Sequence, residues 1–475
     1  MDTVPNELWL EIFEHLPRKS LSQASLTAHS FWRLARPFLF RHFHFHPYAY
    51  YDGSFYLPSP ERMARAKERL HFWLSDEIAP FVHECRISSW SERHCQDSTD
   101  SPNILLDILL LQLPRFTNLW HLTANCATFT GAAMSTLRGM STLRHLEIER
   151  CWVDAEESLE SFSPALTLFS FSGRYRCPLT PWIPFLRPDS DHLRELRLLC
   201  ELRDWNEHLE AIPVYPHVRR LQLNWSNTGT NDCLAVLSRF PNIRVAGILD
   251  FVGHDRRFNS LASITFPFLK VLTVSCNCLP VILPRAPLGK LTVGDGTAKE
   301  LISRLEELDK SATVAIYSLR LDSIPLDPDG EGLKKILQYF PHLVRLRVEA
   351  NFSNHDTATM LLTVFPWVSF SQSTLESVSI SLSAVQSQKS VAVRRALMEK
   401  CPGVTSLRLE GADFELRWRM HGDGIVEEDY VPVQNEDDNL SPEAEELLSC
   451  LRKDFNIWWN AGDNASNLRG PSTVM

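Results

Sequence analysis

The sequence lacks any apolar run long enough to cross a membrane as a helix, which takes about 20 residues. Its longest apolar run, at residues 104–113, is interrupted by Asp107. The N-terminal residues MDTVPNE contain neither the basic segment nor the apolar segment of a secretory signal. We therefore expect a protein of the cytoplasm and/or the nucleus that has no membrane partner.

The sequence also lacks the cysteine pattern of a zinc-binding module. It has 11 cysteines but no Cys-x-x-Cys pair, and its one close pair, Cys276 and Cys278, has no histidine pair at zinc-finger spacing. His42, His44 and His46 alternate along one face of an expected strand, where the outer two would lie about 13 Å apart. The alternative is a metal ion held by two of these histidines and a ligand from elsewhere in the chain. We predict reduced, buried thiols, no metal site and no cofactor.

No set of residues has the spacing of a catalytic site. The glycines at 294 and 296 lack the third glycine of a phosphate-binding loop, whose place Lys299 takes. His94 and Cys95 lie in a polar stretch, where an exposed pair is expected. We therefore expect that the protein is not an enzyme.

Basic residues are absent from one long segment. Residues 423–446 contain ten acidic residues and no Lys or Arg, and the net charge of the whole chain is −10. The rest of the chain is therefore neutral overall, so nothing attracts a nucleic-acid backbone to it as a whole. We predict a solvated acidic loop at residues 421–446 and no nucleic-acid partner.

One pattern recurs along the chain: apolar, two residues, apolar, one residue, apolar. Twelve copies begin at residues 119, 143, 166, 193, 218, 243, 269, 288, 316, 343, 375 and 404, with a mean interval of about 26 residues, and a weaker copy begins at Val82. The second half of each copy alternates as a strand does. Several intervening stretches, such as residues 231–240 and 297–308, have helical patterns, and a proline often precedes the strand.

A strand and a helix every 20–29 residues resemble the leucine-rich repeat. The Asn or Cys typical of that repeat occurs as Cys151, Asn277 and Asn351. The resemblance implies an α/β solenoid over residues 81–420, with a parallel sheet on its concave face and helices on its convex face. Its ends need caps, so we expect an N-terminal cap within residues 47–80 and a cap helix within residues 447–475.

The N-terminal segment "VPNELWLEIFEHLP" at residues 4–17 has the spacing of an amphipathic helix. A capping-box pattern at residues 20–23 indicates a second helix and residues 30–42 a third. Three such short helices cannot bury so wide an apolar surface alone. They need a partner, which is either the solenoid end or another protein.

Residues 1–46 resemble an F-box. An F-box directly ahead of leucine-rich repeats resembles the architecture of fungal F-box proteins. The matching residues are Pro5, Glu7, Leu8, Ile12, Phe13, Leu16, Pro17, Leu21, Leu26, Trp32, Leu34 and Ala35, whereas Val4 and Ala28 depart from the pattern. The resemblance implies a substrate-recognition subunit of an SCF-type ubiquitin ligase, which docks on the small adaptor protein and, through it, on the cullin. It also implies a set of adaptor contacts: Pro5, Leu8, Ile12, Phe13, Leu16 and Trp32. The alternative is a repeat scaffold that binds proteins without a ligase.

In the C-terminal repeats, alternate strand positions predict a basic ladder on the face that would hold a protein substrate. Its members are Arg320, Arg345, Arg347 and Arg408. Three of them are each followed two residues later by an acid, so the pairs either neutralise each other or bind an acidic or phosphorylated segment. If the ladder is only structural, recognition would move to the groove around His121, His145, Glu195 and Arg220.

Overall fold

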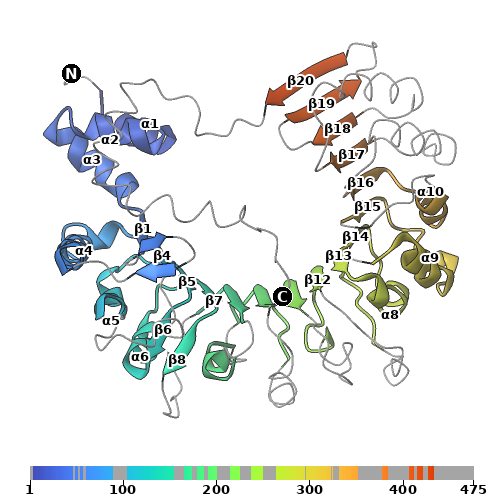
Figure 1. Ribbon diagram of the computed structural model, residues 1–475, viewed down its shortest axis with the longest axis horizontal. Helices are drawn as coiled ribbons and strands as arrows, with labels where there is room; N and C mark the ends of the chain where they lie inside the picture. The colour runs from blue at the N-terminus through green and yellow to red at the C-terminus, as the bar shows by residue number, and fades with distance from the viewer. Residues whose placement is uncertain are drawn as a thin grey trace, which may run out of the picture. The chain divides into compact units, whose positions relative to one another are not determined.

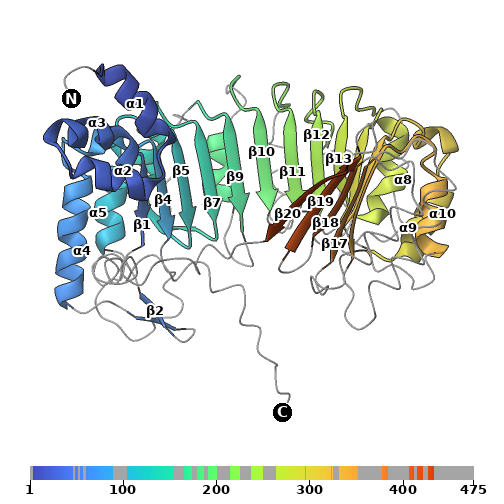
Figure 2. The same cartoon turned by 90° about the horizontal axis from the view of Figure 1, so that it is seen from above.

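Two compact units make up the protein, Met1–Leu193 with Leu440–Met475, and Arg194–Asn439. The structure is a computed structural model, shown in Figures 1 and 2. It describes residues 4–46, 49–51, 54–56, 60–88, 104–154, 165–173, 179–186, 191–199, 214–224, 237–249, 264–294, 296–322, 324, 331–350, 377–382, 406–410, 414–420 and 426–432.

The first unit begins with three helices and continues as repeats of strand and helix. Its α-helices are α1 Asn6–His15, α2 Arg18–Ser25, α3 His29–Leu39, α4 Pro60–Trp73, α5 Ile104–Gln112 and α6 Gly131–Gly139. Its strands are β1 His42–Phe45, β2 Ala49–Tyr51, β3 Ser54–Tyr56, β4 Glu84–Ser88, β5 His121–Asn125, β6 Thr128–Thr130, β7 His145–Glu149, β8 Trp152–Asp154 and β9 Leu168–Ser172. Short 3-10 helices cover Ala79–Phe81, Leu113–Arg115 and Thr180–Leu186.

The three N-terminal helices enclose a small core of their own. Phe13, Leu21 and Ala35, one from each helix, are buried together, and Trp9 and Phe31 pack around them. Prolines set the N-terminal boundaries of the first two helices. Pro5 and Pro17 precede α1 and α2, so α2 begins at Arg18 without a side-chain cap, and the capping box predicted at residues 20–23 lies inside it.

Aromatic side chains attach these helices to the first repeat of the same unit. The ring of Phe40, at the end of α3, lies 5.3 Å from that of Trp73 in α4 and 5.7 Å from that of Trp32. Arg36 adds an ion pair to Glu77 at 2.8 Å. These contacts connect α3 to the N-terminal end of the repeats, which α4 and β1 cap.

The sheet of the first unit is parallel, in the order β1-β4-β5-β7-β9. In β1 the side chains alternate: Phe43 and Phe45 are buried, whereas His42 and His44 are exposed. This alternation extends through β4, β5 and β7, so one sheet face enters the core and the other faces solvent. We call the solvent-facing side the open face of each unit.

The second unit repeats this arrangement. Its strands are β10 Glu195–Leu199, β11 Arg220–Asn224, β12 Val245–Leu249, β13 Val271–Val274, β14 Lys290–Val293, β15 Ser318–Leu321, β16 Arg345–Ala350, β17 Ser377–Leu382, β18 Ser406–Glu410, β19 Phe414–Met420 and β20 Val426–Pro432. Its helices are α8 Leu279–Ile282, α9 Ala298–Glu306 and α10 Glu331–Gln338, with 3-10 helices at Cys276–Cys278, Leu283–Arg285 and Lys310–Ala312. The three α-helices lie on one side of the strands (Figure 1). The predicted helix at residues 297–308 is α9, which a capping box between Thr297 and Glu300 opens.

The sheet of the second unit changes direction at its C-terminal end. Strands β10 to β18 pair in parallel, and β19 and β20 are added antiparallel. Residues 426–432 therefore form an edge strand, although the acidic composition predicts a solvated loop over residues 421–446. In the register of this pair, Arg417 lies opposite Asp429 and Arg419 opposite Glu427. Opposite charges at directly opposed positions favour the pairing of two strands. The basic residues lie on β19, outside the acidic tract, so the composition of the tract alone does not reveal this partner.

Strands in these α/β repeats recur at the predicted motifs, so the fold is a leucine-rich-repeat type solenoid. Cys151, one of the expected Asn/Cys positions, is buried and accepts the Ala127 N–H at 3.4 Å. Asn277 accepts a hydrogen bond from Arg304 Nε at 3.2 Å. Asn351 and the cap helix predicted within residues 447–475 lie outside the described residues. No helix in the described ranges has the length and apolar content of a membrane span.

Candidate protein-interaction surfaces

The first candidate surface is the solvent side of α1. Leu8 and Ile12, one helical turn apart, are 49% and 45% exposed, and Pro5 at the start of the helix is also exposed. Their apolar side chains are therefore accessible to another molecule. These three residues belong to the predicted adaptor-binding set.

The structure places the other three predicted adaptor contacts differently. Phe13 is 2% exposed and lies in the core of the three helices, so it supports α1 from inside. Leu16 is half-buried against that core. Trp32 is also half-buried, packed on Phe40, with the Arg36 guanidinium 5.4 Å from its ring centre. Helical periodicity does not separate the two sides of a helix that is apolar over so wide an arc.

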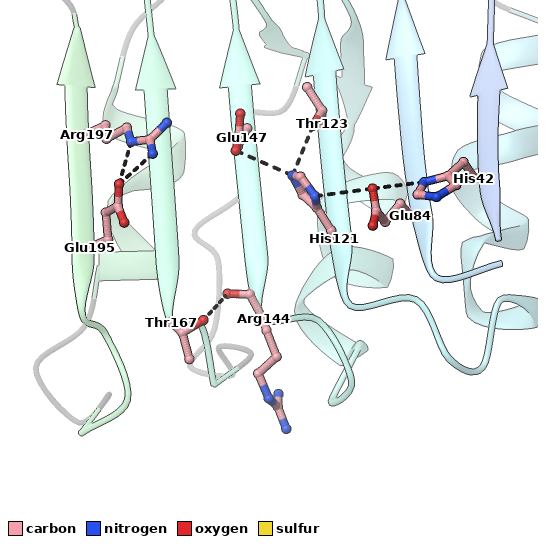
Figure 3. Close-up of polar contacts among 9 residues, drawn as sticks. All are labelled: His42, Glu84, His121, Thr123, Arg144, Glu147, Thr167, Glu195 and Arg197. Carbon is pink, nitrogen blue, oxygen red and sulfur yellow. Dashed lines mark hydrogen bonds and ion pairs between the residues drawn. The ribbon is translucent and has the colours of Figure 1, made fainter. Parts of the chain in front are cut away.

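The second candidate surface is the open face of the first unit, where histidines and carboxylates alternate across four strands (Figure 3). Glu84 Oε2 lies 3.1 Å from His42 Nδ1 and 4.0 Å from His121 Nδ1. On its other side, His121 Nε2 lies 3.4 Å from Glu147 Oε1 and 3.2 Å from Thr123 Oγ1. The histidine contacts with Glu84 and Glu147 become ion pairs when the imidazoles are protonated.

Neighbouring side chains extend this polar row. The His145 ring lies 5.5 Å from that of His121 and 4.7 Å from that of Trp120. Burial lowers the pKa of His44, and the positive charges of Arg86 and Arg18 lower it further. Among the described residues, no cluster of His, Cys, Asp and Glu has the geometry to hold a metal ion.

The third candidate surface is the open face of the second unit. At its first strands, Glu195 lies 2.6 Å from Arg197 and 3.5 Å from Arg220. At its later strands, Arg320 of β15 pairs with Asp322, which directly follows that strand.

The predicted arginine ladder is present in the strand register. Arg320 on β15 aligns with Arg347 on β16, and Ser318 aligns with Arg345. Ser379 of β17 lies between Arg347 and Arg408 in the same row, but the side chain of Arg408 lies outside the described residues. The local pairing of Arg320 with Asp322 was one of the two interpretations that the sequence left open.

The sequence pattern does not predict that the histidines and glutamates of β1, β4, β5 and β7 form one connected row, although it indicates His121 and His145 as an alternative site of recognition. The signal was available: His42, Glu84, His121 and His145 align in one row across the parallel strands, and Glu147 lies two residues after His145 on the same face.

Residues 1–46 match the F-box-like family. No curated protein matches the chain. Among solved structures, an internalin from Listeria monocytogenes is similar at 11% sequence identity and a TM-score of 0.27, covering 73% of this chain and 89% of the internalin. The assignment of the repeats therefore rests on their own period and strand register. The chain therefore carries an F-box-like domain at residues 1–46, followed by repeats of the leucine-rich-repeat type.

Proposed function

We propose that the protein is the substrate-recognition subunit of an SCF-type ubiquitin ligase, without catalytic activity of its own. The observation that carries the proposal is the F-box-like domain at residues 1–46, with Leu8 and Ile12 exposed on α1. F-box domains generally bind the small adaptor protein of cullin complexes. In this arrangement the repeats hold a protein substrate on an open face.

The contact with the adaptor is driven by apolar burial. Covering a large aliphatic side chain completely is worth about 1.5–3 kcal/mol, and Leu8 and Ile12 are already half-covered. Removing both side chains beyond Cβ should therefore weaken adaptor binding by roughly 10- to 100-fold. Phe13 contributes through the fold of the helices, so its truncation would confuse a loss of contact with a loss of structure.

The test is capture of the purified adaptor by the full chain, measured for the native protein and for the double variant Leu8→Ala, Ile12→Ala. A matched control is Ile104→Ala, Leu111→Ala, which truncates one Ile and one Leu of similar exposure (54% and 48%) on α5. We expect capture by the native chain and the control and its loss in the α1 variant. Failure of the native chain to capture the adaptor would favour the alternative, a repeat scaffold outside any ligase.

A further inference from the structure

The strand register of the second unit places residues from seven strands in one row across its open face. From β10 to β16 the row runs Glu195, Arg220, Val245, Val271, Lys290, Ser318 and Arg345. The next row contains Arg197, Gln222, Gly247, Thr273, Thr292, Arg320 and Arg347. We call these two rows the basic path.

The basic path is positive although the chain carries a net charge of −10. Over β10 to β16, the described side chains of the open face include six bases, Arg197, Arg220, Lys290, Arg320, Arg345 and Arg347, and two acids, Glu195 and Asp322. The bases outnumber the acids two to one even when Glu349, which follows Arg347 on β16, is included. A local charge opposite to that of the whole molecule attracts an acidic partner to this face specifically.

Both described acids already have basic partners. The side chain of Glu195 is 17% exposed between Arg197 and Arg220, and Asp322 binds Arg320. Lys290 and Arg345 are exposed and have no ion pair with any side chain that the structure describes. The charge that remains for a ligand is therefore positive.

The middle of the basic path carries no charged side chain. Between Arg220 and Lys290 the first row has Val245 and Val271, both half-buried, while Gly247 lies beside Thr273 in the second row. The two valines offer an apolar contact to a ligand, and the Gln222 side chain lies beside Gly247, where a Cβ would be 3.4 Å from its Cγ. The path therefore has basic side chains on either side of an uncharged section that contains two valines.

The spacing of the strands sets the spacing of the ligand. Neighbouring strands lie about 4.8 Å apart, so Arg220 and Lys290, three strands apart, are separated by about 14 Å. An extended chain advances about 3.3 Å per residue and covers that distance in about four residues. The two intervals from Lys290 to Arg345 correspond to about three residues.

We propose that the basic path binds an extended protein segment with three Asp or Glu residues spaced by about four and three positions and an apolar residue between the first two. Isolated carboxylates fit bases distributed over several strands, and arginine binds carboxylate through two N–H groups. The inference rests on the proposed function in one respect only: the proposed function is what makes the bound segment part of a ligase substrate.

The test uses the full chain and a fluorescein-labelled peptide, Glu-Ser-Val-Ser-Glu-Ser-Ser-Glu, with its reversed sequence as a second probe. Binding is measured by fluorescence anisotropy at low and high salt. The variant Arg220→Glu, Lys290→Glu, Arg345→Glu reverses the basic path. The matched control Lys299→Glu, Lys310→Glu, Lys335→Glu reverses three exposed lysines on α9, the following 3-10 helix and α10, with the same change in net charge.

We expect at least one probe to bind the native chain, with an affinity that falls as salt screens the charges. The path variant should lose on the order of tenfold or more in affinity, and the control should stay within about twofold. Replacing the three Glu residues of the peptide by Gln should abolish binding, and replacing Val by Ser should weaken it.

Absence of binding by both probes, or an equal loss in the two triple variants, would overturn the inference. Capture of the adaptor is measured on the same proteins. Peptide binding without adaptor capture would retain the basic path and reject the proposed function, whereas adaptor capture without peptide binding would do the reverse.

Discussion

The thiol of Cys151 lies 3.3 Å from the backbone carbonyl oxygen of Ala124, a residue of the preceding repeat. The same sulfur accepts the backbone N–H of Ala127 at 3.4 Å. One buried side chain thus contacts a backbone carbonyl of β5 and a backbone N–H of the turn that follows it, and connects two repeats. A sheet whose strands come from successive repeats depends on such lateral contacts.

Cys151→Ala should lower the free energy of unfolding by about 1–2 kcal/mol, because it leaves buried backbone groups without this partner and removes a packed sulfur atom. Cys151→Ser keeps a donor and an acceptor and should cost less. Urea denaturation followed by circular dichroism measures both. Equal stability of the Ala variant and the native chain would show that the sulfur contacts are dispensable.

Truncation of Phe13 should lower the stability of the N-terminal helices, whereas truncation of Leu8 should not. Phe13→Ala removes a ring from a closed core, where its contacts include Phe31 with ring centres 5.5 Å apart, and should cost about 3–5 kcal/mol. Leu8→Ala changes a half-exposed residue and should stay within about 0.5 kcal/mol. Hydrogen exchange of the amides in α1 to α3 reports this local stability. Strong destabilisation by Leu8→Ala would contradict its assignment to the surface.

Gly296 should not tolerate alanine. Its φ is +99°, and a Cβ there would lie 2.6 Å from Cys276 Sγ. Gly296→Ala should therefore cost roughly 1–2 kcal/mol or more, from strain and from displacement of the buried thiol. Gly139 provides the control, since a Cβ at that position meets no atom within 4 Å. The two midpoints of thermal unfolding should differ clearly, and similar midpoints would exclude a special role for Gly296.

His46 should make the first unit less stable in acid. Burial lowers its pKa in the folded chain, while its Nδ1, 3.2 Å from the Ser88 carbonyl oxygen, has the opposite, smaller effect. The unfolded chain then binds more protons below the ordinary histidine pKa of about 6.5, so this contribution to stability is lost as the pH falls from about 7 toward the lowered folded pKa. His46→Gln should remove that part of the pH dependence.

The measurement is the difference in unfolding free energy between pH 7.5 and pH 5.5, taken for both proteins. Other histidines contribute equally to both, so the difference between the proteins isolates His46. An identical loss of stability in the variant would show that His46 does not contribute.

The sequence alone determines the repeat architecture. The apolar positions of each motif, such as Leu269, Leu272 and Val274, recur about every 26 residues and become the buried face of a strand. Periodicity is a local property, so it identifies the motif strand of each repeat and α9 without knowledge of their neighbours. It also places Arg320 and Arg347 on the same face, which the register confirms.

Only the tertiary structure decides which apolar residues of α1 are inside. Leu8, Ile12 and Phe13 belong to one broad apolar arc, and the packing of α2 and α3 buries Phe13 while Leu8 and Ile12 stay exposed. The tertiary structure also decides that residues 426–432 form a strand, because a strand needs the edge of a partner, here β19, to pair with. Both outcomes depend on contacts between distant segments, and a local pattern carries no information about those contacts.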